Sequence, residues 1–321
     1  MTVAVTGATG FVGRHVVREL VSRGISVRAL VRDRAKAIDV LPTDHTTLVV
    51  GDALDGTALA DLVDGAQAVI HTVGIRRELP ESVTFDRLHA GATGQILDAA
   101  RAAGVRRFIQ VSALGVRPNA PTGYQQSKYE AEKLVKKSGL AWTIFRPSLI
   151  HGAEGEFTQM VRGWVLGREM PYAALPYFCK VEKSAGFPPK PVIKSAKIAP
   201  VAVEDVARAV VESLSRDESE GEIYAMCGGE VLEWPELVRE MSDAVRMKGK
   251  DKPIIPIPGV LASMKTKALE MVGMGATLPF GPSEPMLAIE DGVCGNEKLE
   301  AHLGVKPQGF RESLAAYAGT I

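Results

Sequence analysis

Three side chains in the middle of the chain could together move a proton to or from an oxygen atom. Ser112 ends the apolar stretch F-I-Q-V-S, and the segment Y-Q-Q-S-K runs from Tyr124 to Lys128. Residues four apart lie on one face of a helix, so the ammonium of Lys128 can reach toward the phenol of Tyr124. A nearby cation favours the phenolate, which makes a tyrosine useful as an acid or base at neutral pH. With Ser112 hydrogen-bonding a substrate oxygen, the set suits hydride exchange at a C–OH or C=O carbon and predicts three catalytic residues.

A second pair with the same spacing, Tyr129 and Lys133, follows in the same predicted helix, so the bare pattern arises easily. A shift of five residues turns Tyr129 roughly 140° away from Tyr124, so the two tyrosines cannot face one ligand. Tyr124 lies nearer the helix start, close to the strand ends where ligands of parallel sheets bind. We therefore expect Tyr124 to be the reactive tyrosine.

A glycine-spaced turn at the start of the chain has the pattern of a dinucleotide site. Residues 3–13 read V-A-V-T-G-A-T-G-F-V-G, and helical periodicity follows. Glycines spaced in this way allow a tight turn, approach of the backbone to a pyrophosphate and close packing of helix on strand. The N–H groups and dipole of the helix N-terminus add an anion site. An ordinary tight turn is the alternative. The expected cofactor-binding residues are Gly7, Thr9, Gly10, Phe11, Val12 and Gly13.

The residues at the end of the second predicted strand indicate which nicotinamide cofactor binds. It reads V-R-D-R, with Arg32 and Arg34 on either side of Asp33. Arginine accommodates the 2′-phosphate of NADP, whereas sites that prefer NAD usually place an acidic residue on the ribose 2′-OH. We expect NADP(H), with Arg32 as the main phosphate ligand and Arg34 beside it. In the alternative interpretation, the arginines are solvated charges and Asp33 binds the ribose of NAD.

Apolar strands alternate with helical patterns in the first half and predict the elements that position these residues. The expected strands are residues 3–6, 26–31, 46–50, 68–72, 107–111 and 141–145, and the expected helices are residues 11–23, 54–63, 82–103 and 123–138. This pattern predicts an α/β fold: a Rossmann-type doubly wound parallel sheet, with ligands beyond the carboxyl ends of its strands. We expect residues 1–150 to form this NAD(P)-binding domain. Residues 151–321 would form a smaller C-terminal α/β substrate lobe, interleaved with the first domain.

The second half is less regular. Residues 156–166, 206–214 and 234–245 are expected as helices, and residues 201–203 and 222–226 as strands. Residues 171–200 are expected to form a long lysine-rich loop, residues 253–258 an extended connector, and residues 261–272 an apolar stretch with two lysines. Packed over the site, residues 170–200 and 254–280 would form an apolar wall, typical of a pocket for a lipophilic substrate. In the alternative, both segments cover core or contact a partner protein.

Bulk composition excludes few functions. Lys and Arg number 38, as do Asp and Glu, so no global field favours nucleic acid or an anionic membrane. No apolar run approaches the ~20 residues of a membrane span, although the apolar C-terminal segment allows peripheral contact with a membrane or protein. The first predicted strand begins at residue 3, so we expect no signal peptide. Cys179, Cys227 and Cys294 lack C-x-x-C spacing, so we expect buried thiols, no metal site and a cytoplasmic location.

These motifs resemble those of an extended or atypical short-chain dehydrogenase/reductase of the epimerase/dehydratase type. The matching segments are T-G-A-T-G-F-V-G from Thr6, V-S-A at Ser112, Y-Q-Q-S-K from Tyr124 and F-R-P-S-L-I-H-G from Phe145, with V-E-D-V-A at residues 203–207. The chain is also similar to bacterial relatives of the NAD(P)-binding accessory subunit of respiratory complex I, through G-D-A-L-D at residues 51–55 and W-T-I-F-R-P-S from Trp142.

The resemblance implies further cofactor contacts by position. Asp52, with Ala53 beside it, would contact the adenine, and Val73 and Gly74 would flank the adenosine ribose. Lys128 would bond the nicotinamide ribose, and the nicotinamide would be lined by Pro147, Ser148, Leu149 and Ile150. A turn residue that caps the next helix is the alternative for Asp52. One departure is that His71-Thr-Val-Gly replaces the usual N-A-G-like triplet, and we expect His71 to be a packed residue rather than a base.

Two functions from different classes remain open at this point. An oxidoreductase would use Ser112, Tyr124 and Lys128 on a lipophilic alcohol or ketone, or on a nucleotide sugar as an epimerase or dehydratase does. A structural or assembly protein related to the complex I subunit would hold NADPH without turnover, because bound nucleotide stabilises a fold by mass action. An intact Tyr124–Lys128 pair favours the enzyme, since a structural site has no use for a reactive phenol.

Overall fold

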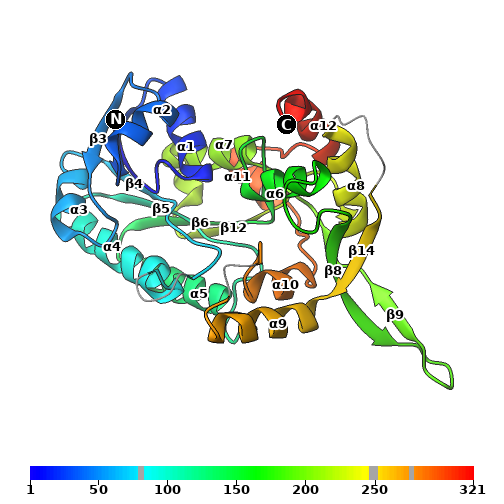
Figure 1. Cartoon of the computed structure of the whole chain (residues 1–321). Coiled ribbons are helices and arrows are strands. Elements are labelled where there is room, and N and C mark those ends of the chain that lie inside the picture. Colours follow the sequence, from blue (N-terminus) through cyan, green and yellow to red (C-terminus); the bar gives the residue numbers. More distant parts are fainter. Residues whose placement is uncertain (79–82, 246–251, 275–277) are drawn as a thin grey trace. The chain divides into compact units, whose positions relative to one another are not determined.

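The computed structural model describes residues 1–78, 83–245, 252–274 and 278–321 of the chain (Figure 1). The described residues form two compact units, each built from three segments. Unit 1 contains residues 1–147, 203–226 and 295–306, and unit 2 contains residues 148–202, 227–294 and 307–321. The chain passes from unit 1 to unit 2 between Pro147 and Ser148.

Unit 1 is built on a seven-stranded sheet in the order β12-β6-β5-β4-β1-β2-β3. All neighbouring strands are parallel, with Val3 level with Val27 on one side and with Ala68 on the other. The strand order reverses between β1 and β4, the doubly wound arrangement that the sequence predicts. The strands are β1 (Thr2–Thr6), β2 (Ser26–Val31), β3 (Thr46–Val50), β4 (Ala68–His71), β5 (Arg107–Val111), β6 (Ala141–Pro147) and β12 (Glu222–Met226).

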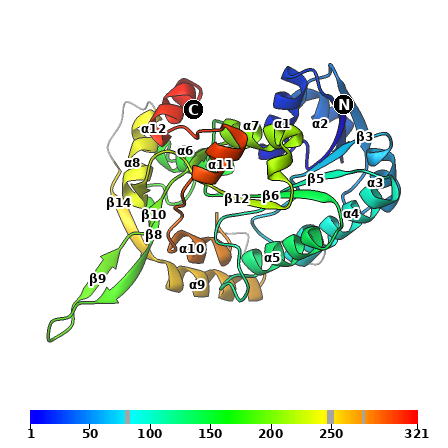
Figure 2. The same cartoon turned by 180° about the vertical axis from the view of Figure 1, so that it is seen from behind.

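Helices cover both faces of this sheet, so its central strands are buried throughout. Every residue of β4 and β5 is buried, as expected for strands without a solvent face. In Figure 1, α1 and α7 lie on one face of the sheet and α4 and α5 on the other. Figure 2 shows α11 beside β12 and α7, which it contacts. The helices of unit 1 are α1 (Phe11–Ser22), α2 (Arg34–Val40), α3 (Gly56–Val63), α4 (Ala92–Ala102), α5 (Gly123–Lys136), α7 (Val203–Glu212) and α11 (Glu297–Leu303).

Two local features of unit 1 differ from the sequence-based prediction. Helix α2 was not expected, although Asp33 caps it by accepting hydrogen bonds from the N–H groups of Ala35 and Lys36. The predicted helix at residues 82–103 begins with a π-helical turn, η1 (Asp86–Gly91), and continues as α4. Its first residue, Ser82, lies outside the described residues. Single π-helical turns occur frequently at functional sites.

Unit 2 contains a three-stranded sheet in the order β14-β8-β9, with β8 parallel to β14 and antiparallel to β9. Its other elements are short: the strands β7 (Ile150–His151), β10 (Lys197–Ile198), β11 (Val201–Ala202) and β13 (Leu232–Glu233), and the helices α6 (Glu156–Val165), α8 (Trp234–Ala244), α9 (Gly259–Met271), α10 (Ser283–Ala288) and α12 (Phe310–Tyr317). Buried side chains of α6, β8, α8 and α12 form one apolar core.

This sheet corrects two predictions. The expected loop at residues 171–200 contains β8 (Leu175–Lys183) and β9 (Pro191–Lys194), and the expected connector at residues 253–258 contains β14 (Ile254–Pro258). Prolines argued against strands, but β14 and β9 are the edges of the sheet, where a strand tolerates a missing N–H. The two segments expected to form an apolar wall therefore lie side by side within unit 2. Residues 275–277 of the second segment lie outside the described residues.

The cysteines correct another prediction. Cys227 and Cys294 form a disulfide within unit 2, with their Cα atoms 5.8 Å apart, and only Cys179 is a buried free thiol. The two partners are 67 residues apart in sequence, so spacing alone could not reveal the pair. A cytoplasmic location can no longer be argued from free thiols and stays a prediction. None of the helices in the described residues has the length and apolar character needed to cross a bilayer.

Candidate functional site

The glycine-spaced turn joins β1 to α1 in unit 1 and shows why each glycine is needed. Gly7 has a φ of +71°, and a Cβ there would lie 2.7 Å from Thr72 Oγ1. A Cβ at Gly13 would overlap the carbonyl oxygen of Gly7, so the helix can approach the turn only with glycine here. The N–H of Gly10 donates to that same carbonyl at 2.9 Å. The turn therefore brings bare backbone to the end of β1.

The first turn of α1 is open to a ligand. Its N-cap, Gly10, has no side chain to accept from the helix N–H groups, and Thr9 and Gly10 are exposed. Phe11 and Val12 are half-buried. A helix start of this kind leaves N–H donors at the positive end of the dipole, which suits a phosphate. The residues present thus fit the pyrophosphate of a dinucleotide.

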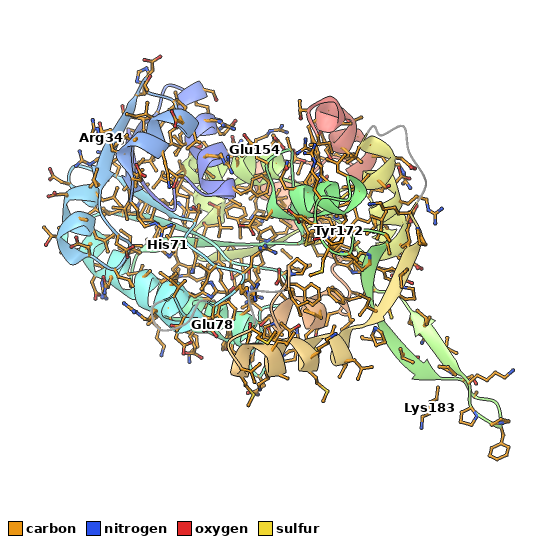
Figure 3. All side chains as sticks on the ribbon, in the orientation of Figure 1. Arg34, His71, Glu78, Glu154, Tyr172 and Lys183 are labelled. Carbon is orange, nitrogen blue, oxygen red and sulfur yellow. A yellow bond between two sulfur atoms is a disulfide. The ribbon has the colours of Figure 1, made fainter. Side chains whose placement is uncertain are left out.

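Beyond β2, the charged side chains differ in what they contact. One carboxylate oxygen of Asp33 accepts from the N–H groups of Ala35 at 3.0 Å and Lys36 at 3.2 Å. Arg32 and Arg34 are exposed and make no hydrogen bond or ion pair with the described part of the chain. Figure 3 shows Arg34 at the outer edge of unit 1, beside α2. Asp33 is thus engaged as a helix cap, while both guanidinium groups face solvent.

Asp52 is a turn residue in the structure. Its carboxylate accepts from the N–H of Leu54 at 2.9 Å, whereas the cap of α3 is Asp55. The side chain of Ala53 is half-buried and packs against the core of unit 1. A contact of either residue with adenine stays a prediction.

Lys128 is buried on α5 and reaches the ends of two central strands. Its ammonium lies 3.4 Å from the carbonyl oxygens of Val73 and Val111, which follow β4 and end β5. A Cβ at Gly74 would lie 2.9 Å from its Nζ, so glycine leaves room for the amine. Burial lowers the pKa of Lys128 to about 8, against a smaller opposing effect of Glu132. The lysine therefore lies where the sequence predicts ribose contacts, with Val73 and Gly74 beside it.

Tyr124 lies one helical turn before Lys128 and is half-buried. Its ring meets the rings of Phe85 and His89 edge-on, with centroids 5.8 Å and 5.4 Å away. His89 belongs to the π-helical turn and stacks on Phe85. The π-helical turn and α5 thus hold the Tyr124 ring between aromatic neighbours.

A chain of hydrogen bonds fixes His89 in its neutral form. Its Nε2 accepts from the N–H of Ile75 at 3.2 Å, and its Nδ1 donates to Ser127 Oγ at 2.8 Å. The Ser127 hydroxyl in turn donates to the carbonyl of Tyr124. Burial, with a further effect of Lys128, lowers the pKa of His89 to about 2. His89 could not be predicted from the sequence, because nothing in its spacing links it to Tyr124 across 35 residues.

Ser112 lies at the end of β5 and is connected to a buried ion pair. Its hydroxyl donates to Glu132 Oε1 at 2.7 Å, and Arg146 binds both oxygens of Glu132 at 2.8 and 2.5 Å. The Glu132 carboxylate has no solvent exposure. With its proton directed to Glu132, Ser112 offers lone pairs and acts as an acceptor for a substrate hydroxyl. Glu132 and Arg146 were not predicted, although Glu132 continues the four-residue spacing of Tyr124 and Lys128.

His71 is a packed residue, as expected from the sequence. It is buried at the end of β4, inside unit 1 in Figure 3. Thr6 Oγ1 donates to its Nδ1 at 2.7 Å, and its Nε2 donates to Thr93 Oγ1 at 3.1 Å. Burial lowers the pKa of His71 to about 3. The ring therefore ties β1 and β4 to α4 and is no candidate base.

The predicted nicotinamide segment divides between the units. Pro147 ends β6, and its carbonyl accepts from the N–H of Leu114 within unit 1. Within unit 2, the Ser148 hydroxyl donates to the carbonyl of Ala199. After Leu149, Ile150 of β7 pairs with Val201 of β11. Contacts of these four residues with nicotinamide stay a prediction.

Comparisons with known proteins relate part of the chain to NAD(P)H-binding proteins. Residues 7–163 match a family described as NAD(P)H-binding. A ceramide reductase of Caulobacter vibrioides is 38% identical over 47% of this chain and 46% of that protein. An NAD(P)H azoreductase of Xenophilus azovorans is 24% identical over 85% and 81%. Subunit 9 of the mitochondrial NADH dehydrogenase 1 alpha subcomplex of Arabidopsis thaliana is 29% identical over 75% and 57%. The chain thus spans about half the length of the ceramide reductase.

Solved structures share the fold over nearly the whole chain. An NADPH-dependent quinone oxidoreductase from Escherichia coli, solved with NADPH, gives a TM-score of 0.69 at 22% identity, covering 98% of this chain and 99% of that one. A UDP-glucuronic acid 4-epimerase from Bacillus cereus, solved with UDP-glucuronic acid and NAD, gives 0.70 at 15% identity over 99% and 98%. Residues 7–163 are therefore similar to the NAD(P)H-binding family, and the chain shares its fold with the quinone oxidoreductase and the 4-epimerase.

Proposed function

We propose that the protein is an NADPH-dependent oxidoreductase that reduces a carbonyl group of a lipophilic small molecule. The observation that carries the proposal is the cluster of Tyr124, Lys128, Gly74 and His89 beyond the ends of β4 and β5. A buried lysine with a lowered pKa beside a half-buried phenol is costly for a fold and is found mainly where a site uses it.

Four side chains of the site have roles in this reaction. Bound NADPH would supply the hydride. The Tyr124 phenol donates the proton that the carbonyl oxygen gains, and the Lys128 ammonium stabilises the phenolate that remains. Ser112 accepts a hydrogen bond from the product hydroxyl, because its own proton is directed to Glu132. The neutral ring of His89 packs against Tyr124 and keeps water from one side of the phenol.

The choice of NADPH rests on the end of β2. Arg32 and Arg34 face solvent, and Asp33 is engaged as the cap of α2, so the free charge at this position is positive. Charge-assisted contacts of this kind contribute about 1.5–3 kcal/mol each. Arg32→Ala should therefore weaken NADPH binding roughly 10- to 100-fold and leave NADH binding unchanged. Arg106→Ala, an exposed arginine elsewhere in unit 1, is the matched control in the same titration. Equal affinity of the unmodified protein for both nucleotides would contradict the assignment.

The substrate class is inferred from chemistry and from relatives. Arg162 and Arg168 are the only arginines at residues 148–200, and a sugar diphosphate calls for more cationic contacts. Two proteins similar to this chain are named for a ceramide and a quinone. NADPH oxidation should be measured with short-chain quinones and with long-chain ketones, and NADP⁺ reduction and epimerisation should be measured with UDP-sugars. We expect turnover in the first two sets, whereas turnover with the UDP-sugars alone would overturn the lipophilic class.

A second candidate function is a protein that holds NADPH for structural reasons. The similarity to a complex I subunit over 75% of this chain favours it. In that case NADPH would raise the melting temperature through binding linkage, yet no carbonyl compound would be reduced. The same panel, combined with melting curves, separates the two candidates.

A further inference from the structure

The hairpin of β8 and β9 has an outer half that no other strand of the described residues covers. Residues 175–179 of β8 pair with β14, whereas residues 180–183 pair only with β9. Every residue of β9 and the last four of β8 are exposed. Figures 1 and 2 show this hairpin extending away from the rest of unit 2, and Figure 3 places Lys183 near its tip. A two-stranded ribbon exposed on both faces is marginally stable by itself, so contact with another surface would stabilise it.

The outer hairpin, residues 180–194, combines cations with exposed apolar side chains. It carries four lysines and one glutamate in a chain whose net charge is zero. Phe187 at the tip is 99% exposed. Val181 and Ile193 lie directly opposite each other and are both exposed. An aromatic tip and an apolar cross-strand pair among lysines are the composition of segments that bind at a lipid headgroup boundary.

The register places two lysines directly opposite each other on one face of the outer hairpin. Lys180 lies directly opposite Lys194, a like-charge pair that weakens a hairpin in water. Glu182 forms an ion pair with Lys194 at 2.6 Å, which leaves Lys180 without a carboxylate partner in the described residues. Anionic groups outside the chain would relieve this repulsion. A second copy of the same lysine-rich hairpin would increase it.

A neighbouring helix of unit 2 adds to the same surface. Helix α9 packs against β8 and β14 and lies, like the outer hairpin, at the lower edge of unit 2 in Figures 1 and 2. Leu261, Met264 and Met271 are exposed on α9 at helical spacing, with Met264 64% exposed. Lys265 and Lys267 are exposed beside them. The helix thus repeats the combination of apolar side chains and lysines found in the outer hairpin.

We propose that the outer hairpin and α9 form a docking surface for a membrane rich in anionic phospholipid. Phe187 inserts at the acyl boundary, and the lysines bind the headgroup phosphates. This surface stands apart from the proposed reaction, and its failure would leave that reaction unaffected.

The test is co-sedimentation of the full chain with vesicles of phosphatidylcholine alone or with about one third phosphatidylglycerol. We expect binding to the anionic vesicles only, weakened by salt, because surface charges are screened within about 10 Å at 0.1 M ionic strength. Phe187→Ser should lower the partition coefficient on the order of tenfold. Lys183→Glu combined with Lys190→Glu should lower it by at least as much, since each lysine near an anionic surface contributes severalfold.

Matched controls come from unit 1. Ile38→Ser removes a 50% exposed apolar side chain, and Lys137→Glu combined with Lys306→Glu reverses two exposed lysines. Both controls should bind vesicles as the unmodified chain does. Absence of binding, equal binding to both vesicle types or equal losses in the controls would overturn the proposal. If the chain binds no vesicles and Phe187→Ser changes its oligomeric state in sedimentation velocity, the surface would instead be assigned to contact with a second copy of the chain.

Discussion

Helix α5 carries two tyrosine–lysine pairs of identical spacing, and the contacts of the two pairs differ. Tyr124 and Lys128 lie against the π-helical turn and the ends of the central strands. Tyr129 and Lys133 lie toward the surface, where Lys133 pairs with Glu130 at 2.8 Å and its ammonium is 5.9 Å from the Tyr129 ring. Five residues of helix rotation separate the two pairs.

The two lysines show the consequence of that rotation. Burial lowers the pKa of Lys128 to about 8. The hydrogen bond with Glu130 raises the pKa of Lys133. One amine is poised near neutral pH and the other stays a surface cation. A four-residue motif therefore has chemical meaning only with the strand ends that face it.

The largest expected effect is on carbonyl reduction when one of the two tyrosines is replaced. Tyr124→Phe removes only the phenolic oxygen, so carbonyl reduction should fall by about 10²- to 10⁴-fold, the usual contribution of a positioned acid. NADPH affinity should hardly change, because the ring contacts with Phe85 and His89 remain. Tyr129→Phe is the matched control and should keep full turnover. Steady-state rates and NADPH titrations of both variants measure these effects. Equal losses of turnover in the two variants would show that Tyr124 has no catalytic role that Tyr129 lacks.

The sequence could predict what local spacing encodes. The glycine turn, the strand ends and the Tyr124–Lys128 pair follow from alternation and from helical periodicity, and the fold class was confirmed. Glu132 was within reach of the same argument, because it lies four residues after Lys128. His89 and Arg146 were not, since only the folded sheet brings η1 and β6 to α5. The β9 and β14 strands were missed because their prolines resemble loop signals until their edge positions are known.

A second prediction compares the two lysines by the pH dependence of the stability of the fold. The folded-state pKa of Lys128 is lowered from 10.5 to about 8, so between these values the unfolded chain binds more protons and stability rises with pH. The gain is on the order of 3 kcal/mol by about pH 10.5. Lys128→Met should therefore stabilise the protein most at or below pH 8, and this advantage should shrink toward pH 10.5.

Urea unfolding of the unmodified chain and of Lys128→Met at several pH values measures this difference. Lys133→Met is the control, with the opposite sign. The raised pKa of Lys133 means that its contribution is present at neutral pH and is lost as the pH rises from 10.5 through that pKa. Parallel stability curves for the unmodified chain and Lys128→Met would show that Lys128 is not a buried charge.

The smallest expected effect concerns the two glutamates of α5. The Glu132 carboxylate accepts the hydrogen bond of the Ser112 hydroxyl, whereas Glu130 pairs with Lys133 at the surface. Glu132→Gln keeps the size of the side chain but removes the charge that binds Arg146, so Ser112 loses its fixed orientation. We expect kcat to fall roughly tenfold with KM for NADPH unchanged, and Glu130→Gln to be silent.

A double-mutant cycle separates positioning from a general loss of structure at Glu132. If Glu132 acts through Ser112, then Glu132→Gln should cost nothing further once Ser112→Ala is present, because the group it orients is gone. Additive losses in the cycle would instead mean that the Glu132–Arg146 pair supports the fold around β5 and β6, since breaking a buried ion pair is destabilising by itself. Melting temperatures of all four proteins accompany the rates. A drop confined to kcat, absent on the Ser112→Ala background, would establish Glu132 as the residue that positions Ser112.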